Sequence, residues 1–140
     1  MEWFNAKIKY LKQLENGLIT KVSESYLLNA LSFTEAEARL QGILMEYISE
    51  YQLKSLSPIN IQDVIIDDSK DNFFKTKVCF ISADPDTEKE KKINESYMVQ
   101  ANNSAEAIEK LSERLKGSIV DFEIVSTSKT SILDVFPYEY

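Results

Sequence analysis

The sequence contains no histidine, which removes imidazole as a general base, as a metal ligand and as a charge switch near neutral pH. Its single cysteine, Cys79, excludes an intrachain disulfide and a thiolate-rich zinc site. Its three glycines are too few and too far apart for the Gly-rich loops that bind nucleotide phosphates. From these absences we expect no metal, no cofactor and no catalytic residue.

Long apolar runs are also absent. No run approaches the roughly 18 residues that a membrane-spanning helix needs, and the first residues lack the pattern of a signal peptide. We therefore expect a cytoplasmic protein without a membrane partner. The net charge of −7 disfavours non-specific binding to DNA, whereas an acidic surface suits solubility or a basic protein partner.

The strongest pattern that is present is an internal repeat. The segments 21–40 and 92–111 align without gaps at an offset of 71 residues, with 8 identities in 20 positions. The register continues in the block that follows each segment and, at an offset of 70, in the block that precedes it. A unit of this length is too long for a solenoid repeat, so the pattern indicates a duplicated small domain.

Each copy has the pattern of two strands, a helix and a further strand. Apolar and polar residues alternate at the start of both copies, which is typical of half-buried strands. Asn16-Gly17 favours a tight turn. A capping box predicts the start of each helix: either Thr34 with Glu37 or Ser32 with Glu35 in the first copy, and Asn103 in the second. We predict an α+β fold in which a ββαβ unit is duplicated in tandem. The copies should form an antiparallel sheet with the two helices packed on one face, related by a pseudo-twofold axis.

A polar, charged stretch marks the boundary between the copies. We predict the first ββαβ repeat at 1–66, a linker at 67–72 and the second ββαβ repeat at 73–140. Each copy alone is too small to bury an adequate core, so the two should share one. The first helix should contribute the apolar residues of one face to that core, namely Ala36, Leu40, Ile43, Leu44 and Tyr47.

Lysine and aromatic residues alternate with the predicted core residues of the strands. Such a face combines attraction to phosphate with base stacking in proteins that bind single strands. Alternatively, the lysines only keep an exposed sheet face soluble and its edge unpaired. The candidate binding face consists of Trp3, Lys7, Lys9, Lys21, Phe73, Lys75, Lys77 and Lys92.

Two pairs of carboxylates recur at equivalent positions of the copies. Alternation places Glu24 and Glu95 on the core side. Each is either an acid or base with a raised pKa or a structural group, which lies in a bulge or pairs with a lysine or a tyrosine hydroxyl. The structural interpretation is favoured, because a catalytic site is not needed twice. Asp63 and Asp134 are either ligands of a hard cation or, as is more common, caps of backbone amides.

The last residues are rich in aromatic side chains. Phe136 aligns with Ile65 of the first copy, which favours packing onto the core. Alternatively, Phe136 and Tyr138 form a candidate C-terminal docking segment, since exposed aromatic residues are effective anchors for a partner.

Three stretches together resemble a known family. They are Trp3-Phe4 with its lysine-rich strand, the segment 30–38 (ALSFTEAEA) and the segment 134–138 (DVFPY). On these stretches the chain resembles an uncharacterised domain family of Bacteroidota and their phages. The resemblance spans essentially the whole chain and implies a small cytoplasmic protein. It carries over no site residue.

These observations favour a non-catalytic interaction protein that binds a larger protein partner. The missing residue types remove most enzyme machinery, and a duplicated scaffold presents two similar surfaces. The alternative is a single-stranded nucleic-acid-binding protein that uses the lysine and aromatic face. A third hypothesis is an enzyme based on Glu24, Glu95 or the two aspartates. Exposed strand edges also allow a homodimer.

Overall fold

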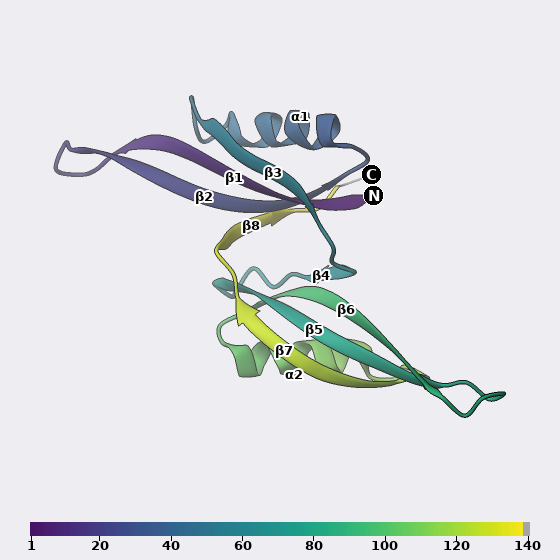
Figure 1. Ribbon diagram of the computed structural model, residues 1–140. Coiled ribbons are helices and arrows are strands. Elements are labelled where there is room, and N and C mark those ends of the chain that lie inside the picture. Colours follow the sequence, from purple (N-terminus) through teal and green to yellow (C-terminus); the bar gives the residue numbers. More distant parts are fainter. Residues whose placement is uncertain (139–140) are drawn as a thin grey trace. The chain divides into compact units, whose positions relative to one another are not determined.

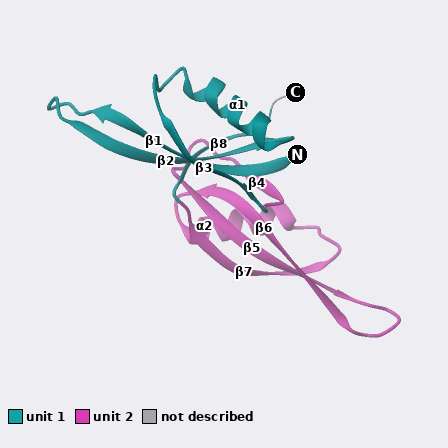
Figure 2. Cartoon of the chain, turned by 45° about the horizontal axis from the view of Figure 1, so that its top comes forward, with its two compact units in different colours: residues 1–60, 131–140 teal, residues 61–130 magenta. Residues whose placement is uncertain are grey.

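The computed structural model describes residues 1–138, and the chain divides into two compact units. Unit 1 consists of residues 1–60 and 131–140, and unit 2 consists of residues 61–130 (Figure 2). The predicted repeats, 1–66 and 73–140, do not coincide with these units. The end of the first repeat, residues 61–66, lies in unit 2, and the end of the second repeat, from residue 131 onward, lies in unit 1.

Unit 1 contains a four-stranded sheet in the order β3-β1-β2-β8 (Figure 1). The strands β1, β2 and β3 pair antiparallel, whereas β8 pairs parallel to β2. A single helix, α1, packs against the sheet. The elements are β1 (Glu2–Gln13), β2 (Ile19–Ala30), α1 (Phe33–Leu44), β3 (Gln52–Ile59) and β8 (Ile132–Phe136).

Unit 2 repeats this arrangement with the strand order β4-β6-β5-β7. The helix α2 packs against its sheet, and the short strand β4 pairs parallel to β6. The elements are β4 (Asp63–Ile65), β5 (Asn72–Ala83), β6 (Glu90–Ala101), α2 (Ser104–Leu115) and β7 (Asp121–Lys129). The predicted α+β class and the repeated ββαβ order are confirmed. The strands form two sheets, one in each unit, and the short strand at one edge of each sheet pairs in parallel.

The parallel edge strands are exchanged between the repeats. Tyr26 of β2 is in register with Asp134 of β8, and Tyr97 of β6 is in register with Asp63 of β4. Both pairs are related by the repeat offset of 71 residues. Each repeat therefore donates its last strand to the same edge of the sheet built by the other.

The strand registers also repeat within the two sheets. Against β3, the register of β1 shifts between Lys7 and Ile8, and against β7 the register of β5 shifts between Lys77 and Val78. A bulge at equivalent positions is a specified feature of a strand pair and not a random defect. The internal geometry of the units thus supports the duplication, while the pseudo-twofold axis between them stays a prediction.

A buried cluster lies under the helix of each unit. Each of these two clusters is built from residues of a single unit, and the core that we expected the copies to share stays a prediction. In unit 1 the cluster combines alternate residues of the strands with one face of α1, namely Phe4, Ala6, Ile8, Tyr26, Leu28, Ala30, Ala36, Leu40 and Leu44. In unit 2 it consists of Phe74, Val78, Val99, Ala101, Ala107 and Leu111.

Helix α1 is capped by Ser32, one of its two predicted capping residues, and α2 is capped by Asn103 as predicted. The side chain of Ser32 accepts the backbone N–H of Glu35 at 3.1 Å, and the side chain of Asn103 accepts that of Glu106 at 2.8 Å. Each contact satisfies an N–H that has no partner inside the helix. Each helix has 12 residues. In the described part of the chain, no helix is long and apolar enough to cross a membrane.

The hairpin of β1 and β2 closes through a longer loop than the expected Asn16-Gly17 turn. The N–H of Gly17 donates to the carbonyl of Leu14 at 2.9 Å, and the N–H of Leu14 donates to the carbonyl of Leu18 at 2.7 Å. Gly17 has a φ of +84°, the left-handed conformation that glycine adopts at low cost. This pattern is typical of a hairpin loop in which a turn is followed by a left-handed residue.

Candidate functional site

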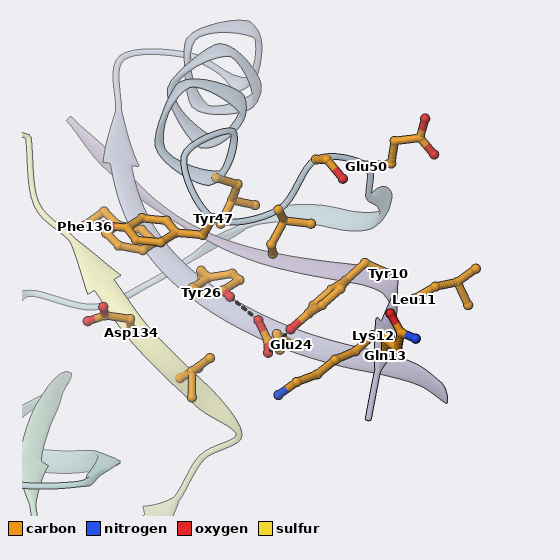
Figure 3. A pocket seen from close by; sticks show the side chains of 14 residues that line it. Tyr10, Leu11, Lys12, Gln13, Glu24, Tyr26, Tyr47, Glu50, Asp134 and Phe136 are labelled. Carbon is orange, nitrogen blue, oxygen red and sulfur yellow. Dashed lines mark hydrogen bonds between the residues drawn. The ribbon is translucent and has the colours of Figure 1, made fainter. Parts of the chain in front are cut away.

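A cleft of about 670 Å³ opens in unit 1 (Figure 3). Its walls come from β1, β2, β8 and the segment that follows α1. Its lining includes the aromatic and acidic side chains of Tyr10, Glu24, Tyr26, Tyr47, Asp134 and Phe136. The cleft joins residues from both ends of the chain, because β8 completes the sheet of this unit.

Glu24 accepts two tyrosine hydroxyls on the cleft wall. Tyr10 donates to one carboxylate oxygen at 2.7 Å, and Tyr26 donates to the other oxygen (Figure 3). The strand register explains this convergence. Tyr26 follows Glu24 by two residues on the same face of β2, and Tyr10 is the diagonal neighbour across β1. The contacts support the structural interpretation of Glu24, which the sequence left open.

Unit 2 repeats part of this arrangement. Tyr97 donates to Glu95 at 3.2 Å. Phe80 takes the place of Tyr10 and has no hydroxyl to donate. The tyrosine and glutamate pair is thus common to both units, while the second tyrosine belongs to unit 1 alone.

The carboxylate also changes the acidity of the tyrosines. The hydrogen bond to Glu24, followed by burial and by the Glu24 charge, raises the pKa of Tyr10 to about 12. The pKa of Tyr26 is raised further, first by burial, then by the bond to Glu24 and by nearby charges that include Asp134. Both hydroxyls therefore remain protonated donors at neutral pH.

A titration tests this pairing. Because the folded pKa of Tyr10 exceeds its ordinary value of 10, its contribution to stability is complete below pH 10 and is lost as the pH rises towards 12. We expect Glu24→Gln to lower the pKa of Tyr10 and to reduce this alkaline loss of stability. NMR of carbon-labelled tyrosine rings measures the pKa values. Glu95→Gln is the matched control, which should change Tyr97 and leave Tyr10 unchanged; equal changes of Tyr10 in both variants would contradict the assignment.

Two further aromatic rings extend the cleft. Phe136 of β8 stacks on Tyr26 with ring centroids 5.5 Å apart and an interplanar angle of 29°. Tyr47 follows the end of α1 and is 79% exposed. Our prediction that Tyr47 belongs to the core was wrong, because α1 ends at Leu44 and no longer holds this side chain on its buried face. The repeat alignment contained a signal for this, since Ser118 is the equivalent residue in unit 2.

The charged residues of the cleft give it a negative potential. Three carboxylates, those of Glu24, Glu50 and Asp134, line it together with one ammonium group, that of Lys12. A cleft with a surplus of one sign concentrates ions of the opposite sign. Aromatic faces add to this preference, since the ring quadrupole attracts cations. The cleft is therefore chemically suited to a positively charged ligand group.

The end of each exchanged strand is held by what we call the strand latch. In unit 1, Arg39 of α1 donates to the carbonyl of Asn29 and, at 3.4 Å each, to those of Phe136 and Pro137. Its guanidinium lies 5.0 Å from the ring centroid of Tyr138, whose N–H donates to the Asn29 side chain at 2.6 Å. Phe136 and Tyr138, the candidate docking segment, are thus held against unit 1.

The strand latch recurs in unit 2 with other residue types. Lys110 donates to the carbonyl of Gln100 at 2.9 Å and to the Asp67 carboxylate at 2.7 Å. The N–H of Asp67 donates to the Gln100 side chain at 2.9 Å. The Lys110 ammonium, followed by hydrogen bonds from Ser69, lowers the pKa of Asp67. Within the predicted linker 67–72, Asp67 is therefore an anchored residue.

The lysine and aromatic face is divided between the units. Strand registers place Trp3, Lys7, Lys9 and Lys21 together on the face of the unit 1 sheet opposite to α1. The corresponding face of unit 2 carries Phe73, Lys75, Lys77 and Lys92. All six lysines are exposed, whereas Trp3 is half-buried and Phe73 is only 1% exposed. The ring of Phe73 is thus inaccessible to a stacking base.

The two aspartates of the exchanged strands have a structural role at their own backbone. Asp63 accepts the N–H of Val64 at 2.8 Å, and Asp134 accepts the N–H of Val135 at the same distance. These contacts fit the amide-capping interpretation. Among residues 1–138, no group of three or more acidic or thiol side chains is placed to hold a metal ion.

Comparison with known proteins places the chain in a family without assigning an activity. No curated protein and no solved structure matches it. One family model matches residues 2–138, which is almost the whole chain, and confirms the uncharacterised family expected from the sequence. The chain belongs to the family DUF4494, a domain of unknown function.

Proposed function

We propose that this chain is a non-catalytic interaction protein that binds a larger protein partner through the cleft of unit 1. The observation that carries the proposal is the combination of a cleft of about 670 Å³, an aromatic lining in which Tyr47 is exposed, and a surplus of carboxylates. Aromatic residues are the most effective anchors at protein interfaces. The acidic cleft favours a partner with a basic surface.

An apolar hairpin tip borders the cleft and extends the same surface. Leu11, which lines the cleft, is exposed, and so are Leu14, Leu18 and Ile19 at the tip of the β1–β2 hairpin. Exposed apolar side chains that gather in one place are typical of interaction sites. The equivalent tip in unit 2, residues 84–89, is charged and polar. The difference favours unit 1 as the binding unit.

Site-specific crosslinking tests the proposal. A photoreactive phenylalanine analogue at Tyr47 should capture a protein in cells that naturally contain this chain. The same analogue at Ser118, the equivalent position of unit 2, is the matched control and should capture none. The captured protein, once purified, should bind the wild-type chain in titration calorimetry and bind Leu14→Glu/Leu18→Glu at least tenfold more weakly. A captured protein that does not bind the purified chain would overturn the proposal, as would the absence of any capture.

The nucleic-acid alternative rests on the exposed lysines. Lys7, Lys75 and Lys77 are accessible, and binding that depends on them should weaken as the salt concentration rises. Fluorescence anisotropy with labelled single-stranded oligonucleotides measures this, with Lys→Glu variants at the three positions as controls. The buried Phe73 weakens the alternative, because base stacking normally supplies much of the affinity of such binders.

The proposal includes the setting of the protein. We place it in the cytoplasm of Bacteroidota or of cells infected by their phages, in keeping with the family resemblance. A homodimer through an exposed sheet edge is a second mode of association. Analytical ultracentrifugation of the purified chain distinguishes this mode from binding to another protein.

A further inference from the structure

The helix residue that pairs with the aspartate of the exchanged strand in unit 2 is replaced by an apolar residue in unit 1. In unit 2, Arg114 of α2 donates from Nη1 to the Asp63 carboxylate at 3.0 Å. Asp134 is the equivalent aspartate of unit 1, and Ile43 of α1 is the equivalent of Arg114. Within residues 1–138, no lysine or arginine pairs with Asp134. The same backbone geometry therefore holds a guanidinium in unit 2, whereas among residues 1–138 the carboxylate of unit 1 has a backbone N–H as partner but no cation.

The surroundings of Asp134 suit a guanidinium that comes from outside. Asp134 is exposed and lines the cleft together with Tyr47, whose aromatic side chain is exposed. A guanidinium can hydrogen-bond a carboxylate in its plane while its face stacks on an aromatic ring. A lysine ammonium is a strongly hydrated point charge that cannot stack in this way. Arg114 shows that this position beside the strand accommodates the larger group.

We propose that the cleft of unit 1 binds an arginine side chain of the protein partner, with Asp134 as the carboxylate acceptor. The inference rests on the proposed function and names the group that the cleft recognises. Glu24 adds negative charge, while its two oxygens already accept tyrosine hydroxyls. Tyr47, exposed at the end of α1, covers the guanidinium from the side of the helix. The partner thus supplies to unit 1 the cation that Arg114 supplies within unit 2.

A pair of short peptides measures the recognition directly. The probe is acetyl-Gly-Arg-Gly-amide, and its control contains citrulline, which has nearly the same shape without the charge. Titration followed by amide NMR should show shifts at Tyr26 and Asp134 with the arginine peptide and about tenfold weaker binding of the citrulline peptide. Asp134→Asn should reduce binding of the arginine peptide by about three- to tenfold. Equal binding of the two peptides would overturn the inference.

Moving the arginine between the units provides the second test. Ile43→Arg should place a guanidinium on Asp134 within the chain, as Arg114 does on Asp63, and so abolish binding of the arginine peptide. Ile43→Gln introduces a polar side chain without the charge and is the matched control, which should retain binding. Circular dichroism and thermal unfolding verify that both variants are folded. Loss of binding in both variants would mean that bulk or polarity, and not the cation, blocks the cleft.

The partner identified by crosslinking separates this inference from the proposed function. A partner that binds wild type but binds Asp134→Asn and Ile43→Arg at least tenfold more weakly supports both. A partner whose affinity is the same for all of these variants overturns the arginine inference and leaves the proposed function standing. Failure to capture any partner, together with peptide binding, overturns the proposed function while the arginine preference of the cleft stands on the peptide data.

Discussion

A chain cut between Lys70 and Asp71 is expected to remain one particle in solution. Each piece carries an edge strand that the other piece requires, since β4 pairs with β6 and β8 pairs with β2. The contacts of Asp67 with Lys110 also join the two pieces after this cut. Native mass spectrometry and gel filtration of the co-expressed pieces should show one species with the mass of the whole chain, which separates only on denaturation.

The position of the cut offers a graded control. A cut between Asn60 and Ile61 transfers β4 to the second piece, so the exchange of β8 is the remaining strand pairing across the cut. This pair of pieces should associate more weakly than the pair cut after Lys70. Pieces cut after Lys70 that separate while each stays folded would show that the exchanged strands contribute little to holding the chain together.

Removing Arg39 should release the end of β8. Its guanidinium donates to three carbonyls and stacks on Tyr138, so Arg39→Met removes all these contacts while keeping much of the aliphatic side chain. We expect the free energy of unfolding to fall by about 2 kcal/mol, the usual size for hydrogen bonds that involve a charged group. The amides of β8 should lose protection in hydrogen exchange more than those of β1.

Two further variants separate the geometry of the guanidinium from its charge. Arg39→Lys keeps the charge but has a single ammonium group, so it should restore only part of the lost stability. Lys116→Met, at the exposed end of α2, should change stability by no more than about 0.5 kcal/mol. Unchanged protection of β8 in Arg39→Met would contradict the role of Arg39 in the strand latch.

The main elements of the fold follow from local patterns. Alternation of apolar and polar residues identified the long strands, and Asn103 identified where α2 begins. For α1 the sequence offered Ser32 and Thr34, and the structure selects Ser32. These features depend on neighbouring residues, and the sequence contains that information. The length of the hairpin loop was predicted less well, because Asn16-Gly17 fits both a two-residue turn and the left-handed end of a longer loop.

The strand exchange was not predictable from this sequence. Val64 and Val135 are equivalent residues, and the edges of β2 and β6 that receive them are equivalent as well. Pairing within a repeat and pairing between repeats therefore form the same kinds of contact. The choice depends on the path of the chain in space, which no local pattern encodes.

The cleft was also missed, for a related reason. Its residues come from β1, β2, the end of α1 and β8, and only the exchange brings β8 beside the others. The tyrosine partners of Glu24 were anticipated as one option, since a carboxylate on the core side needs a hydroxyl or a cation. The strand registers put the lysines on the sheet faces opposite to the helices. The burial of Phe73 depends on tertiary packing, and alternation alone cannot reveal it.

The division of the chain has a consequence for its synthesis on the ribosome. Unit 2 is one continuous stretch, residues 61–130, whereas unit 1 requires a strand that is translated after it. Growing chains fold in the order in which their segments emerge, provided that a folding unit is complete. The unit whose translation starts first must therefore finish folding last, and until then β2 has an open edge that chaperones or a neighbouring nascent chain can occupy.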